Sequence, residues 1–169
     1  MKKTLILLGM MGAGKSTLGK IVAKKQGLKF IDTDRNVEKN NGMKIDEIFN
    51  KKGEKFFREE EEKVVMESMQ NENCVIALGG GAFINKTIRD HVLKKSISIW
   101  LDADLKILRE RIRLNKKRPL LNVKNDKLKL SQLYNERKDI YKLADHKIDC
   151  SKLTKIDIVK KIIDFYEKF

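Results

Sequence analysis

Short apolar runs alternate with longer amphipathic segments along the whole chain. Five of the runs are strand-like, and they lie at residues 4–9, 29–34, 74–79, 97–102 and 146–150. Each run is nearly continuous in apolar residues, which is typical of parallel strands covered on both faces. The pattern therefore predicts a parallel sheet of five strands.

Helical periodicity fills most of the sequence between these runs. Apolar side chains recur at helical spacing near residues 15–26, 53–71, 85–95, 103–114, 126–144 and 155–168. Strands that alternate with helices indicate a three-layer α/β fold with helices flanking the sheet. Because the chain shows no internal repeat, linker or low-complexity segment, we expect residues 1–169 to form one domain.

Two segments interrupt the alternation. Residues 35–60 insert polar, helical-looking sequence after the second strand, where a small substrate-binding insertion would lie. Residues 113–125 are rich in basic residues and contain the only proline of the chain, Pro119. This second segment is either a mobile lid or an ordinary exposed loop.

The composition is that of a globular protein. Hydrophobic residues make up 41% and charged residues 37% of 169 positions. No apolar run approaches the ~18 residues that a membrane span needs, so we expect a cytoplasmic protein with no membrane partner. Cys74 and Cys150 lack metal-ligand spacing, and we expect them to be buried, reduced thiols.

The formal net charge of +14 indicates an anionic partner, either a nucleic acid or a small polyanion such as ATP. The sequence has no recognised nucleic-acid motif, and aromatic residues make up only 7% of it. The charge is also spread widely along the chain. We therefore expect small-molecule ligands and no nucleic acid.

A phosphate-binding loop is the strongest motif. The stretch "GMMGAGKS", Gly9 to Ser16, fits G-x-x-x-x-G-K-[ST] between a predicted strand and a predicted helix. Its backbone N–H groups and the helix N-terminus would face phosphate oxygens, which predicts a P-loop NTPase fold. Lys15 would reach the β- and γ-phosphates, and the Ser16 hydroxyl would bind Mg²⁺. The residues expected to bind ATP here are Gly12, Ala13, Gly14, Lys15, Ser16 and Thr17.

Mg²⁺ also needs an acidic partner. The stretch "FIDTD" places Asp32 and Asp34 two residues apart, so both carboxylates would lie on one face of a strand. Asp102 also ends a predicted strand, but it precedes a helix, and we expect it to be the N-cap. We therefore assign Asp32 to the metal and leave Asp34 for a substrate hydroxyl.

Three arginines lie where a charge needs an explanation. Arg137 falls on or beside the apolar face of the helix predicted at 126–144, and Arg58 belongs to "FFREEEE". Each could form a structural ion pair or bind an anion in a cleft. Arg118 precedes Pro119 and is either an exposed loop residue or an arginine that reaches a transferring phosphoryl group.

Taken in order, these motifs resemble the shikimate kinase family. The matching stretches are "GMMGAGKST", "FIDTD", "FFREEE", "LGGGAF", "RPLL" and "ER" ahead of Tyr141, and they extend through most of the chain. The resemblance implies an enzyme of aromatic amino acid biosynthesis. It would transfer the γ-phosphate of ATP to the 3-hydroxyl of shikimate with Mg²⁺ as cofactor.

The resemblance also implies roles on the shikimate side. Asp34 would accept hydrogen bonds from substrate hydroxyls and is a candidate base, while Arg58 and Arg137 would grip the carboxylate. In the family, backbone N–H groups of a glycine run lie against the ring, and the corresponding residues here are Gly79, Gly80 and Gly81. The alternative is that these three glycines form only a tight turn from strand to helix.

On the nucleotide side, the resemblance makes Arg118 a catalytic lid residue that contacts ATP and makes Arg111 the residue that packs on adenine. An ordinary exposed helix arginine is the alternative for Arg111. The family usually has a proline two residues after the position of Arg137, and this chain has Asp139 there. The local geometry beside Arg137 is therefore the point where the match is weakest.

Three other functions compete with this one. A gluconate kinase or a nucleoside-monophosphate kinase would share the phosphate loop but not the set formed by Arg58, the glycine run and Arg137. A nucleic-acid-associated ATP-binding protein would explain the charge. A degraded enzyme would not be expected to keep both Lys15 and Asp34. We expect a monomeric kinase.

Overall fold

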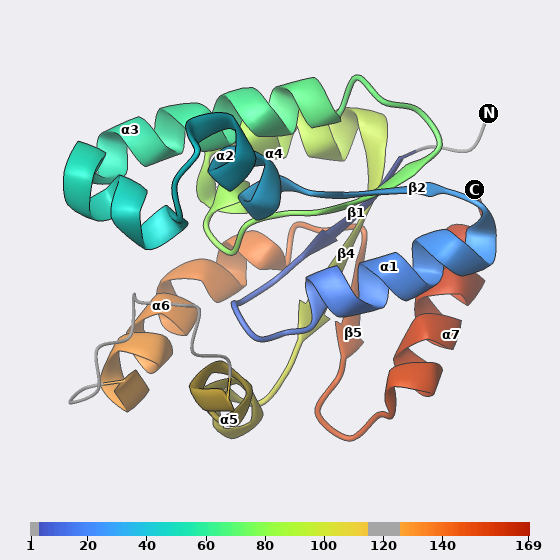
Figure 1. The fold of residues 1–169 in the computed structure, drawn as a ribbon. Coiled ribbons are helices and arrows are strands. Elements are labelled where there is room, and N and C mark those ends of the chain that lie inside the picture. The colour runs from blue at the N-terminus through green and yellow to red at the C-terminus, as the bar shows by residue number, and fades with distance from the viewer. Residues whose placement is uncertain (1–3, 115–125) are drawn as a thin grey trace.

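Five parallel strands form the centre of the fold. They are β1 (Thr4–Leu8), β2 (Lys29–Asp32), β3 (Cys74–Ala77), β4 (Ser96–Asp102) and β5 (His146–Asp149). The computed structural model describes residues 4–114 and 126–169, and it orders these strands β2-β3-β1-β4-β5 (Figure 1). Every neighbouring pair is parallel, which confirms the predicted five-stranded sheet.

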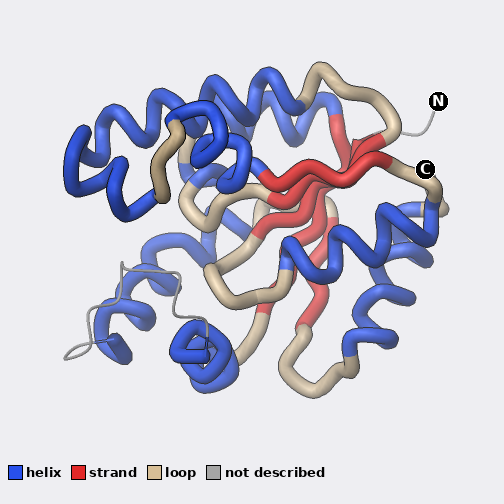
Figure 2. Tube along the Cα trace, viewed as in Figure 1, coloured by secondary structure: helices blue, strands red, loops and turns tan. Residues whose placement is uncertain are grey.

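Seven helices and a short 3-10 turn make up the rest of the regular structure in the described residues. They are α1 (Lys15–Gln26), α2 (Thr33–Asn41), α3 (Ile45–Ser68), η1 (Ala82–Ile84), α4 (Lys86–Lys95), α5 (Leu105–Leu114), α6 (Asp126–Tyr141) and α7 (Lys155–Tyr166). Figure 2 shows these helices on both sides of the strands. The predicted three-layer arrangement is confirmed.

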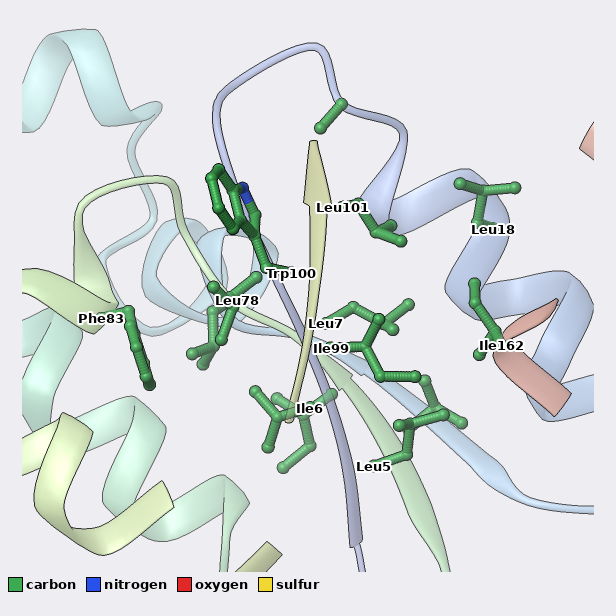
Figure 3. Packing of buried hydrophobic residues seen from close by; sticks show 14 of the residues in the cluster. Leu5, Ile6, Leu7, Leu18, Leu78, Phe83, Ile99, Trp100, Leu101 and Ile162 are labelled. Atoms are coloured by element: carbon green, nitrogen blue, oxygen red, sulfur yellow. The ribbon is translucent and has the colours of Figure 1, made fainter. Parts of the chain in front are cut away.

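The core lies on both faces of the sheet. Every residue of β1, β3 and β4 is buried, so apolar residues occur on both faces of these strands, and their polar residues, Thr4, Ser96, Ser98 and Asp102, are buried as well. Figure 3 shows Leu18 of α1 and Ile162 of α7 on one side of the strands and Phe83 on the other. Burial of each such side chain contributes about 1.5–3 kcal/mol to folding.

The polar segment after β2 folds as α2 and the first half of α3. Gly53 has φ 83° and kinks α3, which therefore consists of two helical halves, and the second half begins where the sequence predicts a helix from about residue 53. A separate small cluster holds these helices together, and its members are Val37, Ile48, Phe57 and Val64.

The strand ends bring the functional segments together. In the sheet register Leu7 is beside Ala77, and Ala77 is beside Asp32. Since β1, β2 and β3 are parallel, the phosphate loop, the start of α2 and the glycine run all leave the sheet at one edge. This carboxyl edge is where parallel α/β sheets bind ligands.

Asp102 differs from its prediction. It is the last residue of β4, and α5 begins only at Leu105, so Asp102 is not a helix N-cap. Its carboxylate instead accepts hydrogen bonds from Ala103 N (3.0 Å) and Tyr134 Oη (3.2 Å) and pairs with Lys147 Nζ at 2.8 Å.

Two smaller points concern the thiols and the membrane. Cys74 and Cys150 are both buried and free, as predicted. Among residues 4–114 and 126–169, no helix combines the length and apolar character needed to cross a bilayer.

Candidate active site

The phosphate loop has the backbone that its glycines predict. Gly9, Gly12 and Gly14 have φ values of 136°, 81° and 95°, in the region that favours glycine. A Cβ at Gly9 would also overlap the carbonyl oxygen of Leu101 on β4. The loop therefore needs glycine both for its turns and for its packing on the sheet.

Lys15 is held inside this loop. Its side chain is buried, and its Nζ donates to the carbonyl oxygens of Gly9 (2.8 Å) and Met10 (2.9 Å). The loop thus fixes the ammonium group at the position from which it can reach a phosphate. A fixed cation needs no reorganisation when negative charge develops near it.

A cleft of about 410 Å³ opens beside the loop. We refer to this hollow as the nucleotide cleft. Lys155 and Ile158, at the start of α7, form part of the wall of this cleft. No sequence motif marks either residue as a ligand contact. The lining includes most of the residues predicted to bind nucleotide and metal: Gly12, Ala13, Gly14, Lys15, Ser16, Thr17, Asp32, Asp34 and Arg111.

Of the two arginines expected on the nucleotide side, Arg111 lies within the described residues and Arg118 does not. Arg111 lies on the last turn of α5, and its Nη1 donates to Gly12 O at 3.3 Å, so it is placed at the mouth of the nucleotide cleft. Arg118 and most of the expected lid at 113–125 lie outside the described residues.

Asp32 and Asp34 both reach the nucleotide cleft, although not by the route predicted. β2 ends at Asp32, and Asp34 lies in the first turn of α2, so the two carboxylates do not share a strand face. Asp32 is the N-cap of α2, and its Oδ1 accepts a hydrogen bond from Arg35 N at 3.3 Å. This cap starts the helix immediately after the strand.

The donors beside the loop suit Mg²⁺. Ser16 and Asp32 both line the nucleotide cleft and offer oxygen ligands. No group of three or more His, Cys, Asp or Glu side chains that could hold a metal occurs in the described part of the chain. A pair of oxygen donors fits an ion that keeps several waters and binds substrate phosphates rather than a protein cage.

The glycine run makes room for charged side chains. A Cβ on Gly79 would overlap Asp34 Oδ1 and lie 2.7 Å from Glu61 Oε1, and a Cβ on Gly81 would lie 2.5 Å from Arg58 Nη1. Neither glycine has a positive φ. A side chain at Gly79 or Gly81 would therefore displace these charged groups, whereas the dihedral angles of the run do not require glycine.

An ion pair within α3 faces the run. Arg58 Nη1 donates to the buried Glu61 at 2.7 Å (Oε2), and Arg58 Nη2 reaches Glu54 Oε1 at 3.3 Å. The ion pair expected as one alternative for Arg58 is therefore present. Burial raises the pKa of Glu61, the Arg58 charge opposes that shift, and the Asp34 charge adds to it.

This raised pKa leads to a pH prediction. Folding favours the protonated form of Glu61, so the stabilisation is present below its ordinary pKa of 4.5 and is lost as pH rises through the higher folded value. The unfolding free energy of the wild type minus that of Glu61→Gln should therefore fall as pH rises from about 4 to about 8. Urea titrations across this range measure it. A difference that grows with pH would show that the ion pair outweighs desolvation.

Helix α6 brings Arg137 and Tyr141 to the same place. A Cβ on Gly80 would lie 3.6 Å from Arg137 Nη1. Tyr141 is buried, and its hydroxyl donates to the carbonyl oxygen of Gly80. Burial raises the pKa of Tyr141 to about 12, so the hydroxyl remains a donor at neutral pH. We use the name acceptor cluster for the glycine run together with five side chains: Asp34, Arg58, Glu61, Arg137 and Tyr141.

We expect Tyr141→Phe to destabilise the protein by about 1–3 kcal/mol, because the Gly80 carbonyl would lose its buried donor. The same change should lower kcat/KM for the phosphoryl acceptor through the glycine run. Urea unfolding and steady-state kinetics measure the two effects. Tyr134→Phe is the matched control, and a smaller loss is expected because Tyr134 is only half-buried and its partner Asp102 also pairs with Lys147. Equal losses in both variants would contradict this role.

Two further residues lie near the cluster. Thr33 is fully buried, and its Oγ1 accepts from Gly79 N at 3.0 Å and donates to Ala77 O at 3.3 Å. No motif marked Thr33 in advance, and the available signal was a hydroxyl between the two acids Asp32 and Asp34. Asp139 is exposed and pairs with Lys142 at 2.8 Å, so the residue in place of the family's proline stays outside the cluster.

Comparison with known proteins gives a consistent result. The family model described as "Shikimate kinase" matches residues 11–167. A shikimate kinase of Sulfurihydrogenibium sp. is 40% identical over 161 residues, which cover 95% of this chain and 96% of that protein. A shikimate kinase of Thermodesulfovibrio yellowstonii is 38% identical over 166 residues, covering 98% and 96% of the two chains.

Solved structures agree. The shikimate kinase of Acinetobacter baumannii in complex with shikimate superposes with a TM-score of 0.94 at 32% identity, over 99% of this chain and 94% of that one. A gluconokinase of Sinorhizobium meliloti 1021 superposes with a TM-score of 0.60 at 16% identity, over 99% and 93%. The second similarity shows a shared fold and nothing about substrate.

Proposed function

Because this chain belongs to the shikimate kinase family, we propose how its residues divide the work of that family's reaction. The protein is an enzyme that transfers the γ-phosphate of ATP to the 3-hydroxyl of shikimate, giving shikimate 3-phosphate and ADP. The nucleotide cleft would hold ATP, and the acceptor cluster would hold shikimate. Asp34 belongs to both, so the transferred group and its acceptor would meet there.

On the ATP side, the loop N–H groups and α1 would bind the phosphates. Lys15 would neutralise the β- and γ-oxygens as charge moves toward the leaving group. Ser16 and Asp32 would hold Mg²⁺, which supplies further neutralisation of the phosphate charge when it is bound. Arg111 lines the cleft and would contact the nucleotide on the side of its base.

On the shikimate side, Arg58 and Arg137 would clamp the carboxylate. Both guanidinium groups approach the glycine run, Arg58 at Gly81 and Arg137 at Gly80. Guanidinium forks bind carboxylates bidentately, which fixes orientation as well as position. The glycine run would form the wall against the ring, and α2 with the first half of α3 would form the substrate-binding insertion at about 35–60.

Asp34 would accept the hydrogen bond of the attacking hydroxyl and take its proton as the oxygen–phosphorus bond forms. It lies in the first turn of α2, and its Oδ1 is the atom that a Cβ on Gly79 would overlap. Positioning and charge neutralisation supply most of the acceleration in phosphoryl transfer. The carboxylate's main task is therefore to orient the hydroxyl.

The observation that carries this assignment is the shared position of Asp34. This carboxylate lines the nucleotide cleft, and it lies with Glu61 against the position that a Cβ on Gly79 would take. A gluconate kinase or nucleoside-monophosphate kinase shares the loop but gives no reason for this cluster.

We also propose that the enzyme works in the cytoplasm as a single-domain monomer on small molecules. ATP as co-substrate and two free, buried thiols both suit a reducing compartment.

The test is ADP release from Mg-ATP with shikimate, gluconate and nucleoside monophosphates supplied separately, with product masses measured. We expect release with shikimate only, and a product heavier by one phosphoryl group. Release with gluconate or a nucleotide and not with shikimate would overturn the proposed acceptor while keeping the nucleotide cleft.

A further inference from the structure

A second hollow follows the outer strand of the sheet. It has a volume of about 560 Å³, and all four residues of β2 line it. β2 is the edge strand, and in Figure 1 it passes between α1 and the helices α2 and α3. We call this hollow the edge groove. Asp32 is the one residue individually assigned above to catalysis or binding that lines it in the described chain, and Arg35 and Lys39 of the lining belong to α2, part of the expected substrate-binding insertion.

The edge groove is positively charged. All four of its cations are exposed. Three of these cations have only a neutral or a distant partner. Lys29 Nζ donates to the neutral amide oxygen of Asn71 at 3.1 Å, and Lys20 Nζ lies 6.0 Å from the Phe30 ring centre. Arg35 Nε is 3.9 Å from Asp32 Oδ2. The cations of the lining are Lys20, Lys29, Arg35 and Lys39, and its acids are Asp32 and Glu67.

The floor of the groove is an open strand edge. β2 pairs with β3 from Lys29 to Asp32, and no strand of the described chain pairs with its other side. Lys29 N donates to Asn73 O on the β3 side. Because hydrogen-bonding groups alternate in direction along a strand, the N–H and C=O of Phe30 face the open side. Such an edge can pair with an added strand.

Charge and shape favour a peptide over a nucleic acid. Single-stranded nucleic acid binds through stacking on free aromatic faces. The aromatic residue of the lining is Phe30, and its ring packs on α1, where a Cβ on Gly19 would lie 2.6 Å from Phe30 Cε2. The ring is therefore poorly placed for stacking. Backbone pairing flanked by cations suits an extended chain that carries carboxylates.

We propose that the edge groove binds an extended acidic peptide segment of a partner protein, which adds to β2 as a sixth strand. The backbone pairing would supply part of the affinity, and the four cations would select glutamate or aspartate side chains and speed encounter. The site is separate from the acceptor cluster, so binding at the groove does not require shikimate.

The probe is a fluorescein-labelled heptapeptide, Glu-Val-Glu-Val-Glu-Val-Glu, titrated with the full-length protein at low ionic strength and followed by anisotropy. We expect saturable binding that weakens with salt. The same peptide N-methylated at every internal backbone position keeps its charge and has no internal N–H donor on either edge, so we expect its affinity to fall about tenfold or more. Equal binding of the two peptides, or no binding of either, would overturn strand addition.

The protein-side test is the double variant Lys20→Glu/Lys29→Glu, with Lys160→Glu/Lys161→Glu on α7 as a control of equal charge change. All four lysines are exposed. We expect the first variant to lose at least about tenfold in peptide affinity, and we expect the second to lose much less. Shikimate phosphorylation should be unchanged in both, which also shows that they fold.

Two outcomes of this second test would overturn the proposal. Equal losses of peptide affinity in the two double variants would mean that net charge alone attracts the peptide. Tighter binding of an oligo-dT that depends on Lys20 and Lys29 would replace the peptide with a nucleic acid.

Discussion

Lys15→Met is expected to lower kcat for shikimate phosphorylation by about a thousandfold. The change keeps the length of the buried stem and removes the cation that neutralises the phosphate oxygens. It also removes the two hydrogen bonds from Nζ to Gly9 O and Met10 O, so the loop should become less ordered. Single-turnover measurements with saturating Mg-ATP and shikimate separate the chemical step from product release.

The matched control is Lys24→Met, an exposed lysine on the last turn of the same helix, which should keep wild-type kcat. Shikimate affinity should change little in Lys15→Met, because the acceptor cluster does not contain this residue. A kcat within about tenfold of the wild type would show that the phosphate charge is neutralised by other groups.

Gly79→Ala should have the next largest effect. The new methyl group would overlap Asp34 Oδ1 and crowd Glu61 Oε1, which forces at least one carboxylate out of place. Misplacement of a positioning group by about 1 Å can cost a hundredfold in rate, and we expect a loss of that order in kcat/KM for shikimate. Overpacking should also lower the unfolding free energy by about 1–3 kcal/mol.

Gly80→Ala is the matched control, because its new methyl group would approach bound shikimate without overlapping any atom of the protein. Its Cβ would meet Met11 N at 3.5 Å and Arg137 Nη1 at 3.6 Å, which are ordinary contacts. We expect its unfolding free energy to stay within about 0.5 kcal/mol of the wild type while its KM for shikimate rises. Equal destabilisation of the two variants, or wild-type kcat/KM in Gly79→Ala, would contradict the close-approach explanation of the glycine run.

The parallel sheet could be predicted because burial on both faces leaves a local pattern in the sequence. Ser96–Asp102 is buried at every position, and a nearly continuous apolar run satisfies that requirement. The phosphate loop was equally predictable, since its glycines and Lys15 serve local geometry. Patterns of this kind need no knowledge of distant residues.

Single residues decide two of the element boundaries. The periodicity predicts a helix from about residue 53, and the positive φ of Gly53 separates the first half of α3 from a second half that begins there. The apolar run predicts a strand as far as Asp34, whereas the Asp32 carboxylate caps Arg35 N and α2 begins at Thr33. The first boundary agrees with the prediction, and one capping side chain was enough to move the second.

The acceptor cluster was harder to predict because its contacts are non-local. Tyr141 and Gly80 are 61 positions apart in the sequence, and their hydrogen bond depends on how α6 packs against η1, just after the glycine run. Thr33 bridges to Gly79 across 46 positions in the same way. Periodicity fixes which face a residue occupies, but it does not fix which distant residue lies opposite. Only the family resemblance brought Arg58, the glycine run and Arg137 together in advance.

The most direct test of the proposed site is a calorimetric titration of shikimate and of Mg-ATP into the wild type and into Arg137→Ala. Arg137 approaches Gly80 in the acceptor cluster and does not line the nucleotide cleft. We predict that the variant binds shikimate at least about tenfold more weakly, since a charged hydrogen-bond donor to the carboxylate is lost, while its ATP affinity stays close to that of the wild type. Unchanged shikimate affinity, or an equal loss for both ligands, would contradict the division between nucleotide cleft and acceptor cluster.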